Sequence, residues 1–411
     1  MKKNVNTTAI IASQVCWAAL DVFITTFLVA EILYFTGGDV VKAALFYVVT
    51  YTTLFLFFWG TMYFAKRLSS VWCMRVGVAV QVATVSLICA FAHGDKLMDL
   101  YLLFGAMYGA AMGIYWSSTH CFTAHALGSE KMLKFQTALN IATCTGSVVF
   151  PFTLGTIIHY VDFWVAALVA AVIGGVLIVF TAIMKANTLE KRARLSMINF
   201  VRVVKQKKLG PPVAVNFALQ VARGLYLAVP IMTVILITRT FGDSFSLGYL
   251  GSIFAACAIV ILFGYRFIRS RGIQDWVHMA CVIVITGLAV PLLFNVSKLT
   301  VILFQVGAVV LLKIPGVENA KLQIDGVKEL GARELSAESL VVADFGIMLG
   351  RVFIMAMIIL IERVGTDMAF RVLVLVQMSM TIVTYALTRI WWKMVRKTPV
   401  ADATPLLQKG A

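Results

Sequence analysis

Long apolar runs, separated by short polar connections, repeat along the whole chain. Twelve of these runs have roughly the 20 residues that a helix needs to cross a bilayer. The first six are 7–35, 40–65, 72–93, 98–122, 135–159 and 163–184, and the next six are 213–239, 246–268, 276–296, 299–315, 338–361 and 368–392. The pattern predicts an all-α, polytopic membrane protein with 12 transmembrane helices.

The overall composition agrees with this class. Of the 411 residues, 61% are hydrophobic and only 13% are charged, which no soluble globular class reaches. The net charge of +16 comes from basic residues in short segments between the apolar runs, so we read them as loop residues and expect no binding to nucleic acid. The seven cysteines lie in or beside apolar runs without a CxxC, so neither a disulfide framework nor a metal site is expected.

The basic residues also predict the orientation in the membrane. Alternate loops are rich in Lys and Arg, whereas the loops between them are nearly bare of positive charge. The basic side is the cytoplasmic side under the positive-inside rule, and both termini then lie there. We expect an integral protein of the plasma membrane that is embedded in the lipid bilayer as a monomer.

The long basic connection in the middle divides the chain. The expected parts are an N-terminal six-helix bundle (1–184), a basic cytoplasmic linker (185–212), a C-terminal six-helix bundle (213–392) and a cytoplasmic tail (393–411). Within the linker, the amphipathic run at 197–204 could lie at the membrane surface, as any basic loop tethered to a bilayer would.

An internal repeat relates the two bundles. Gly60 matches Gly264, and Gly146 matches Gly350, at the same offset of 204 positions (264 − 60, 350 − 146). The same offset relates Gly38-Asp39 to Gly242-Asp243, Arg67 to Arg271 and Trp72 to Trp276. A constant offset across several helix pairs predicts two parallel six-helix repeats around a central cavity.

Six plus six helices, a basic central loop and parallel repeats resemble the major facilitator superfamily. The loop after helix 2 in that family usually reads G-x-x-x-D-x-x-G-R-[RK]. This chain keeps Gly60 and the basic residues around Arg67, has Phe64 in place of the Asp and lacks the second Gly. The resemblance implies a part in the conformational change for Gly60 and Arg67, and for their repeat partners Gly264 and Arg271.

A second motif points to one branch of that family. Helix 5 of its proton-driven exporters often carries G-x-x-x-G-P-x-x-G-G, and the run GSVVFPFTLG keeps Gly146, Pro151 and Gly155 of it. Phe150 and Leu154 replace two of the glycines. Such residues allow close packing and a bend where one half must rock against the other.

The resemblance implies a secondary transporter that binds a small solute near the midplane and moves it by alternating access. Coupling to protons is expected, with a lean to export (efflux) over uptake. A flippase for a lipid-linked solute and a non-transporting receptor are the alternatives, since one fold serves many functions. No cofactor is expected. The sequence has no P-loop, no Ser-His-acid set and no HExxH motif, so we expect no enzymatic activity and no catalytic residue.

Charged residues deep in the apolar runs are the candidates for binding and coupling. Asp21 is in the middle of helix 1 and Arg223 is near the middle of helix 7, at depths that agree within about one turn. We expect them to face each other, either as a salt bridge or clamp that opens during transport or as a static ion pair. Asp21 is also a candidate proton site.

Helices 10 and 11 supply a second charged group. Lys313 and Asp344 are expected to pair between these helices, and Asp344 and Arg351 share one helical face because they are seven residues apart. Asn140 stands at the repeat position of Asp344 (344 − 140 = 204). The group is open to a structural or a functional reading.

Polar and aromatic residues complete the candidate set. Tyr115 and Trp116 on helix 4 either stack on a substrate or belong to the aromatic belt at the inner interface. Gln14 and Gln220 either line the cavity or form hydrogen bonds between helices. Three glycines before Tyr115 predict a packing face on the same helix: Gly105, Gly109 and Gly113.

Overall fold

The computed structural model is helical throughout the residues that it describes, with no strand among them. These residues are 4–64, 69–92, 96–126, 129–184, 196–242, 244–319, 336–365 and 367–397. Only the backbone is described at 4–7, 64, 96, 120–126, 129–141, 244, 266, 269–270, 336–337 and 397.

The N-terminal half of the structure consists of eight α-helices and one π-helical segment among the described residues. In chain order they are α1 (Asn4–Val22), the π-helical η1 (Phe23–Leu28), α2 (Val29–Phe35), α3 (Val40–Phe64), α4 (Ser70–Phe91), α5 (Lys96–Asp99), α6 (Tyr101–Ala126), α7 (Ser129–Tyr160) and α8 (Phe163–Ile183).

The C-terminal half follows a short connecting helix, α9 (Met197–Gln206). Its elements are α10 (Gly210–Leu227), α11 (Val229–Phe241), α12 (Ser244–Ser270), α13 (Gln274–Ala289), α14 (Pro291–Phe294), α15 (Lys298–Gln305), the π-helical η2 (Val306–Leu311), α17 (Ser336–Val364) and α18 (Asp367–Lys397). The residues at 313–319 extend the helix beyond η2.

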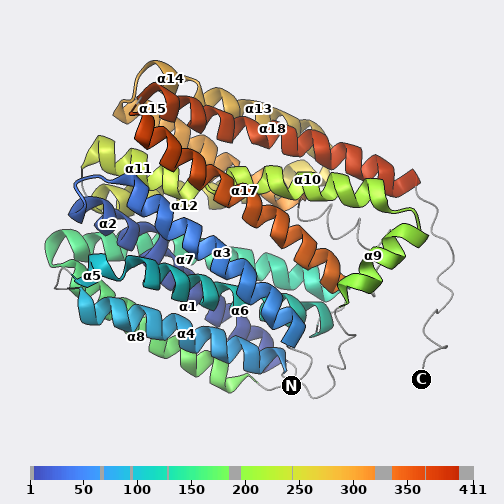
Figure 1. Ribbon diagram of the computed structural model, residues 1–411, viewed down its shortest axis with the longest axis horizontal. Helices are drawn as coiled ribbons and strands as arrows, with labels where there is room; N and C mark the ends of the chain where they lie inside the picture. Colours follow the sequence, from blue (N-terminus) through green and yellow to red (C-terminus); the bar gives the residue numbers. More distant parts are fainter. Residues whose placement is uncertain are drawn as a thin grey trace.

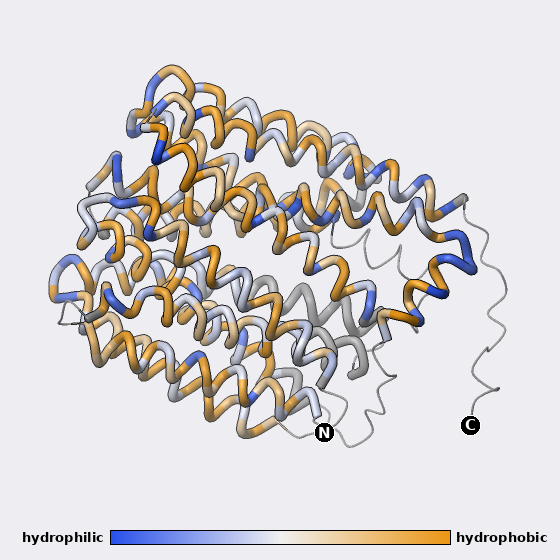
Figure 2. Tube along the Cα trace, in the orientation of Figure 1, coloured by the Kyte–Doolittle hydropathy of each residue, from blue (hydrophilic) through white to orange (hydrophobic). Residues whose placement is uncertain are grey.

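Eleven helical segments of the described chain are long and apolar enough to cross a membrane. The twelfth predicted run, 98–122, corresponds to α6, which at 26 residues is also long enough to span, although its Gly, Tyr and Ser residues make it less apolar. Figure 2 shows apolar residues along the lengths of the helices and polar residues mainly toward their ends and on α9. The chain is therefore an integral, all-α membrane protein, as the sequence predicts.

The helices form two bundles that lie side by side (Figure 1). In the N-terminal half, α6 packs on α3 and α4, and α1 packs on α7 and α8; in the C-terminal half, α10 packs on α17 and α18. The two most extensive seams between the halves are formed by α3 with α17 and by α7 with α12, and α11 makes smaller contacts with α2, η1 and α3. The beginning of α1 and the end of α18 lie at the same end of the molecule (Figure 1). The bundle boundaries at 184 and 213 stay predictions.

Two interruptions at equivalent positions support the internal repeat. In the first half, α1 changes into the π-helical segment at Phe23, and in the second half α10 ends at Leu227, which is 204 positions later (227 − 23). Pro230 explains the second interruption, because its ring has no N–H and clashes with the preceding turn of a continuous helix. Gly38 and Gly242, a predicted repeat pair, follow α2 and α11 with φ of 91° and 81°, a conformation that favours glycine.

The seam between α7 and α12 depends on close backbone contact. A Cβ added to Gly248 of α12 would lie 3.0 Å from the Cα of Gly155, and one added to Gly251 would lie 3.6 Å from the Cβ of Pro151. Ser252 of α12 donates a hydrogen bond of 2.6 Å to the carbonyl of Val148. Pro151 and Gly155 of the helix-5 motif thus lie in a contact between the halves.

The other expected conformational residues have different surroundings. A Cβ on Gly146 would meet the ring of Phe150 at 3.2 Å, whereas one on Gly60 or Gly264 would meet no atom within 4 Å. Arg271 is exposed in the turn after α12, and Arg67 lies outside the described residues. The part of these residues in a conformational change stays a prediction.

The glycine face of α6 packs on α3, as the small-residue spacing predicts. A Cβ on Gly105 would lie 2.9 Å from the carbonyl oxygen of Phe46, and one on Gly109 would overlap Thr50 and Thr53. Thr50 Oγ1 donates a hydrogen bond of 3.2 Å to the Gly105 carbonyl, which close approach makes possible. The contact between these two helices therefore requires residues without a side chain.

We predict that Gly109→Ala lowers the thermal unfolding temperature of the purified protein in detergent. The added methyl group must push α6 away from α3, and overpacking of this kind costs about 1–3 kcal/mol. Gly175→Ala in α8 is the matched control, because its Cβ meets no atom within 4 Å. That control should be neutral or slightly stabilising. Equal unfolding temperatures for both variants would contradict the close packing.

Candidate functional site between the two halves

Asp21 lies in the last turn of α1, two residues before the π-helical segment begins at Phe23. Its carboxylate accepts a hydrogen bond at Oδ1 from the hydroxyl of Tyr108 on α6, and the Tyr108 side chain is only 1% exposed. Thr25 Oγ1 donates to the Asp21 carbonyl at 2.7 Å. The Asp21 carboxylate therefore points toward α6 in the protein interior and not toward lipid, which is where an acidic group at membrane depth is tolerated.

Two tyrosines of α3 extend this polar group toward the neighbouring half. Tyr47 donates a hydrogen bond of 2.7 Å to the carbonyl of Thr25 in the π-helical segment, where the altered turn leaves backbone groups in need of partners. Tyr51 follows one turn later, and its ring centroid lies 5.5 Å from that of Tyr47. Both side chains are buried, so the two hydroxyl groups lie inside the protein.

Arg351 of α17 brings the opposite charge from the C-terminal half. Its guanidinium carbon lies 4.8 Å from the centroid of the Tyr51 ring, so this cation–π contact crosses the seam between α3 and α17. Arg351 is also close enough to Asp21 and Asp344 for electrostatic interaction with both carboxylates. We call the five residues Asp21, Tyr47, Tyr51, Tyr108 and Arg351 the inter-half cluster.

Glycines set the position of α17, and hence of Arg351. A Cβ on Gly350 would lie 2.8 Å from the backbone nitrogen of Leu225 in α10, and one on Gly346 would lie 2.9 Å from the Cβ of Gln220. Contacts this short are possible only for glycine, so α17 lies directly against α10. The side chain of Arg351, next to Gly350, then reaches across to Tyr51 of α3.

The expected pair of Asp21 with Arg223 is not formed in this structure. Among the described residues, the partners of the Asp21 side chain are Tyr108 by hydrogen bond and Arg351 by charge. Arg223 is a partly buried residue of α10, a helix that packs mainly on α17 and α18. The arginine whose charge acts on Asp21 therefore comes from α17, the eleventh predicted helix, and not from the seventh.

Asp344 and Arg351 interact along one face of α17, as their spacing predicts. One oxygen of Asp344, Oδ2, is buried without a hydrogen bond from the described residues. Lys313 is exposed, and no ion pair joins it to Asp344 in the part of the chain that the structure describes. The side chain of Asn140, the repeat counterpart of Asp344, lies outside the described residues.

Tyr115 uses its ring inside the N-terminal half. It stacks on Trp17 of α1 with centroids 3.8 Å apart and an angle of 4° between the planes, and its side chain is 0% exposed. Trp116 meets the Tyr115 ring edge-on with centroids 5.9 Å apart. The Tyr115 hydroxyl is 3.4 Å from Ser13 Oγ. In this structure the ring of Tyr115 is therefore covered by protein, which leaves no face for a stacked substrate.

The two glutamines are also covered by protein. Gln14 is 2% exposed, and its Nε2 finds no hydrogen-bond partner among the described residues. Gln220 donates a hydrogen bond of 3.1 Å from Nε2 to Asn216 Oδ1 on the same helix, and its Oε1 is buried without a partner in the described chain. Each glutamine therefore has one buried amide atom without a hydrogen bond from the described residues. The expected role of both side chains in a cavity stays a prediction.

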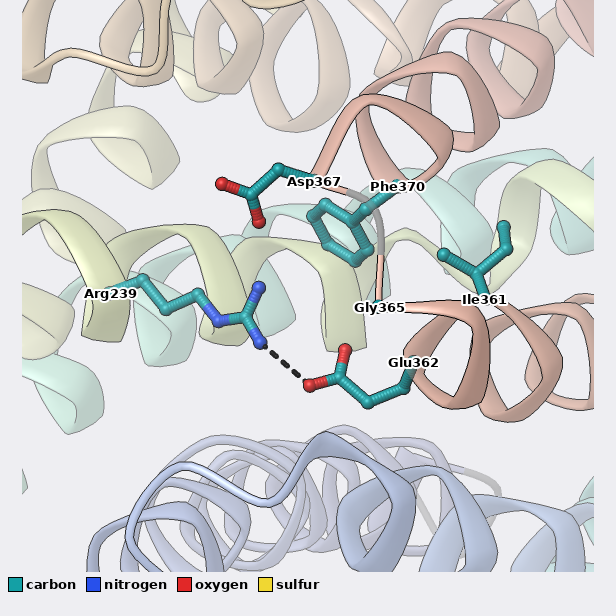
Figure 3. A pocket seen from close by; sticks show the side chains of 6 residues that line it. All are labelled: Arg239, Ile361, Glu362, Gly365, Asp367 and Phe370. Carbon is teal, nitrogen blue, oxygen red and sulfur yellow. Dashed lines mark hydrogen bonds and ion pairs between the residues drawn. The ribbon is translucent and has the colours of Figure 1, made fainter.

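A small pocket lies in the C-terminal half, where α11 and α17 end and α18 begins (Figure 3). Figure 3 shows Arg239 of α11 pointing toward Glu362 of α17, with the Phe370 ring beside the guanidinium. The Arg239–Glu362 ion pair measures 3.2 Å, and both side chains are more than 30% exposed, at 40% and 33%. Such an exposed pair contributes at most about 1 kcal/mol. All lining residues come from one half, so this pocket is separate from the inter-half cluster.

Sequence reasoning missed the three tyrosines of the inter-half cluster. A signal was present, since Tyr47 and Tyr51 are four residues apart in the second apolar run and therefore share one helical face. Tyrosine hydroxyls at membrane depth need hydrogen-bond partners in the protein interior. Which helix supplies those partners depends on how the helices are rotated and packed.

Comparison with solved structures shows the same architecture in known transporters. The nucleoside transporter NupG aligns with a TM-score of 0.63 at 12% identity over 95% of this chain and 99% of the other. A bacterial homologue of the iron transporter ferroportin gives 0.64 at 13% identity over 95% and 98%. The POT family transporter PepTSo gives 0.69 at 10% identity over 96% and 99%.

This chain has the fold of these transporters. The transporter-like helical fold expected from the sequence is thereby confirmed over nearly the whole chain. At identities of 10–13%, the likeness extends to the fold alone. No protein-family model and no curated protein sequence match the chain.

We predict that Tyr115→Leu lowers the thermal unfolding temperature, because the aromatic stack on Trp17 is lost in a fully buried site. The expected cost is about 1–3 kcal/mol. Tyr115→Phe keeps the ring and should remain closer to the parent, since it loses only the interactions of the hydroxyl with Ser13, at 3.4 Å, and with Gln14. Unfolding followed by intrinsic fluorescence in detergent measures both. A Tyr115→Leu variant as stable as Tyr115→Phe would show that the stack contributes nothing.

Proposed function

We propose that this protein is a secondary transporter that moves a small solute across the membrane by alternating access and couples this movement to protons. The observation that carries the proposal is the inter-half cluster, in which a carboxylate from one half and a guanidinium from the other approach each other through buried tyrosines. Charges at membrane depth are costly and are usually retained for transport or ion coupling.

The cluster offers a route from proton binding to movement. When Asp21 is ionised, its charge attracts Arg351, and this attraction favours contact between α3 and α17. A proton on Asp21 removes the attraction while the Tyr108 hydroxyl can still hydrogen-bond to the neutral acid. Proton binding then has different free energies in the arrangements with the seam closed and open, which is the condition for coupling.

The substrate class is open in this proposal, because the cluster carries one charge of each sign. Two of the similar transporters are named for nucleosides and for iron, so the shared fold does not indicate the substrate of this protein. Pro151 and Gly155 of the exporter-like motif lie in the α7–α12 seam and give a slight lean toward export. We place the protein in the plasma membrane with both termini in the cytoplasm, as the distribution of basic residues suggests.

We predict that Asp21→Asn uncouples or stops proton movement. Purified protein in vesicles that enclose a pH-sensitive dye is screened with nucleosides, amino acids, sugars, carboxylates and amphipathic cations for a change in internal pH. With a solute that gives a signal, the rate in Asp21→Asn should fall by about tenfold or more, which corresponds to about 1.4 kcal/mol. Arg351→Ala should show a similar loss, and Arg351→Lys should keep part of the rate.

Asp99→Asn in α5 is the control, because Asp99 is an exposed acid outside the cluster. It should transport like the parent. If Asp21→Asn carries solute and protons at the parental rate and ratio, Asp21 has no part in coupling. If radiolabelled solute moves in that variant without protons, the cluster couples the proton but is not needed for solute binding.

A further inference from the structure

One side of α9 is fixed to the rest of the protein. Phe200 is 9% exposed, and Met197 packs against a cluster that contains Phe58 of α3 and Val341 of α17. The backbone N–H of Ser196, the residue before α9, donates a hydrogen bond of 2.8 Å to Oε1 of Glu338 on α17. The position of α9 is therefore determined by contacts with both halves.

The opposite side of α9 is apolar and basic at the same time. Ile198 is 75% exposed and Val201 is 50% exposed, and Arg202 and Lys205 beside them are exposed as well. At about 100° per residue, these four side chains fall within roughly a third of the helix circumference, centred opposite Phe200. Folding of this chain thus leaves two large aliphatic side chains uncovered between two cations.

The charge on this surface is uniformly positive. Residues 197–208 contain no Asp or Glu, and Lys207 and Lys208 continue the basic run beyond the helix. None of the ion pairs between described residues involves Arg202 or Lys205. An acidic partner for these groups is therefore not supplied by the described part of the chain itself.

The place of α9 narrows the choice of partner. It lies at the end of the molecule where α10 begins, level with the ends of membrane-spanning helices (Figure 1), and it is one of the most polar helices in the structure (Figure 2). Because the ends of membrane-spanning helices reach the polar region of a bilayer, we expect headgroups of one leaflet at that level. An interfacial helix combines aliphatic residues, which enter the acyl boundary, with Lys and Arg, which bind lipid phosphates.

We propose that α9 docks on anionic phospholipid headgroups of this leaflet. Ile198 and Val201 enter the interface, and Arg202 and Lys205 bind the phosphate groups beside them. Because Met197 and Ser196 connect α9 to α3 and α17, the docked helix ties the lipid surface to the seam that the inter-half cluster occupies. This inference is independent of the proposed transport function and of the substrate.

The test measures the depth of α9 in lipid. A nitroxide label is attached at position 198 in a background without the seven native cysteines. The protein is placed in vesicles of phosphatidylcholine alone or mixed with phosphatidylglycerol. Collisions of the label with oxygen and with a water-soluble nickel complex report its immersion. In the mixed vesicles, the label at 198 should meet the nickel complex several-fold less often than in phosphatidylcholine alone.

Two controls make the result specific. A label at Asn199, which points away from the proposed surface, should stay accessible to the nickel complex in both vesicles. Arg202→Gln/Lys205→Gln should return the label at 198 to the accessibility found in phosphatidylcholine, whereas Lys42→Gln/Lys298→Gln near the opposite ends of the helices should not. The unfolding temperature of each variant confirms that it is folded.

The proposal is overturned if the label at 198 is as accessible as the label at 199 in the mixed vesicles. It is also overturned if immersion at 198 is the same in both vesicles and unaffected by removal of the two cations. That second result would mean that α9 inserts by its aliphatic residues alone, without recognition of anionic lipid.

Discussion

Asp21 and Arg351 carry opposite charges at membrane depth, and the interface between the two halves is arranged so that neither charge faces lipid. Each charge alone would cost several kcal/mol in the apolar region of a bilayer. Tyr108 satisfies the carboxylate by a hydrogen bond, and the ring of Tyr51 covers the guanidinium. The two charges come from different halves, so their mutual attraction depends on how closely α3 and α17 approach.

The backbone is shaped around this interaction. Gly346 and Gly350 let α17 lie directly against α10, which leaves Arg351 free to reach α3. The π-helical segment after Asp21 exposes the carbonyl of Thr25, and Tyr47 satisfies it. The break between α10 and α11 at Pro230 occupies the corresponding position in the second half. These two departures from regular helix therefore lie at equivalent positions of the repeats, and the first of them follows Asp21 of the cluster.

The sequence was sufficient to predict the membrane-spanning helices, because their apolar runs and the 204-residue offset depend on residue type and spacing alone. It also singled out Asp21, since a lone carboxylate in an apolar run is visible without a structure. It did not distinguish Arg351 from Arg223 as the partner, because that choice depends on how α17 packs against α10 and α3, which the glycine contacts with α10 help to set. Nor could it show that Tyr115 stacks on Trp17, since both open readings of Tyr115 required its orientation in the bundle.

Distances between spin labels show directly whether the two halves move relative to each other around the inter-half cluster. One label pair at Trp72 and Trp276 joins the halves at one end of the helices, and a second pair at Tyr160 and Phe294 joins them at the other end; all four side chains are at least 54% exposed. Pulsed electron resonance is recorded on each pair at acidic and at alkaline pH, with Asp21→Asn as reference. If protonation of Asp21 drives the movement, the two distances change in opposite directions in the parent and stay constant in the variant. Distances that do not respond to pH at either end, or that change in the same direction at both, would contradict it.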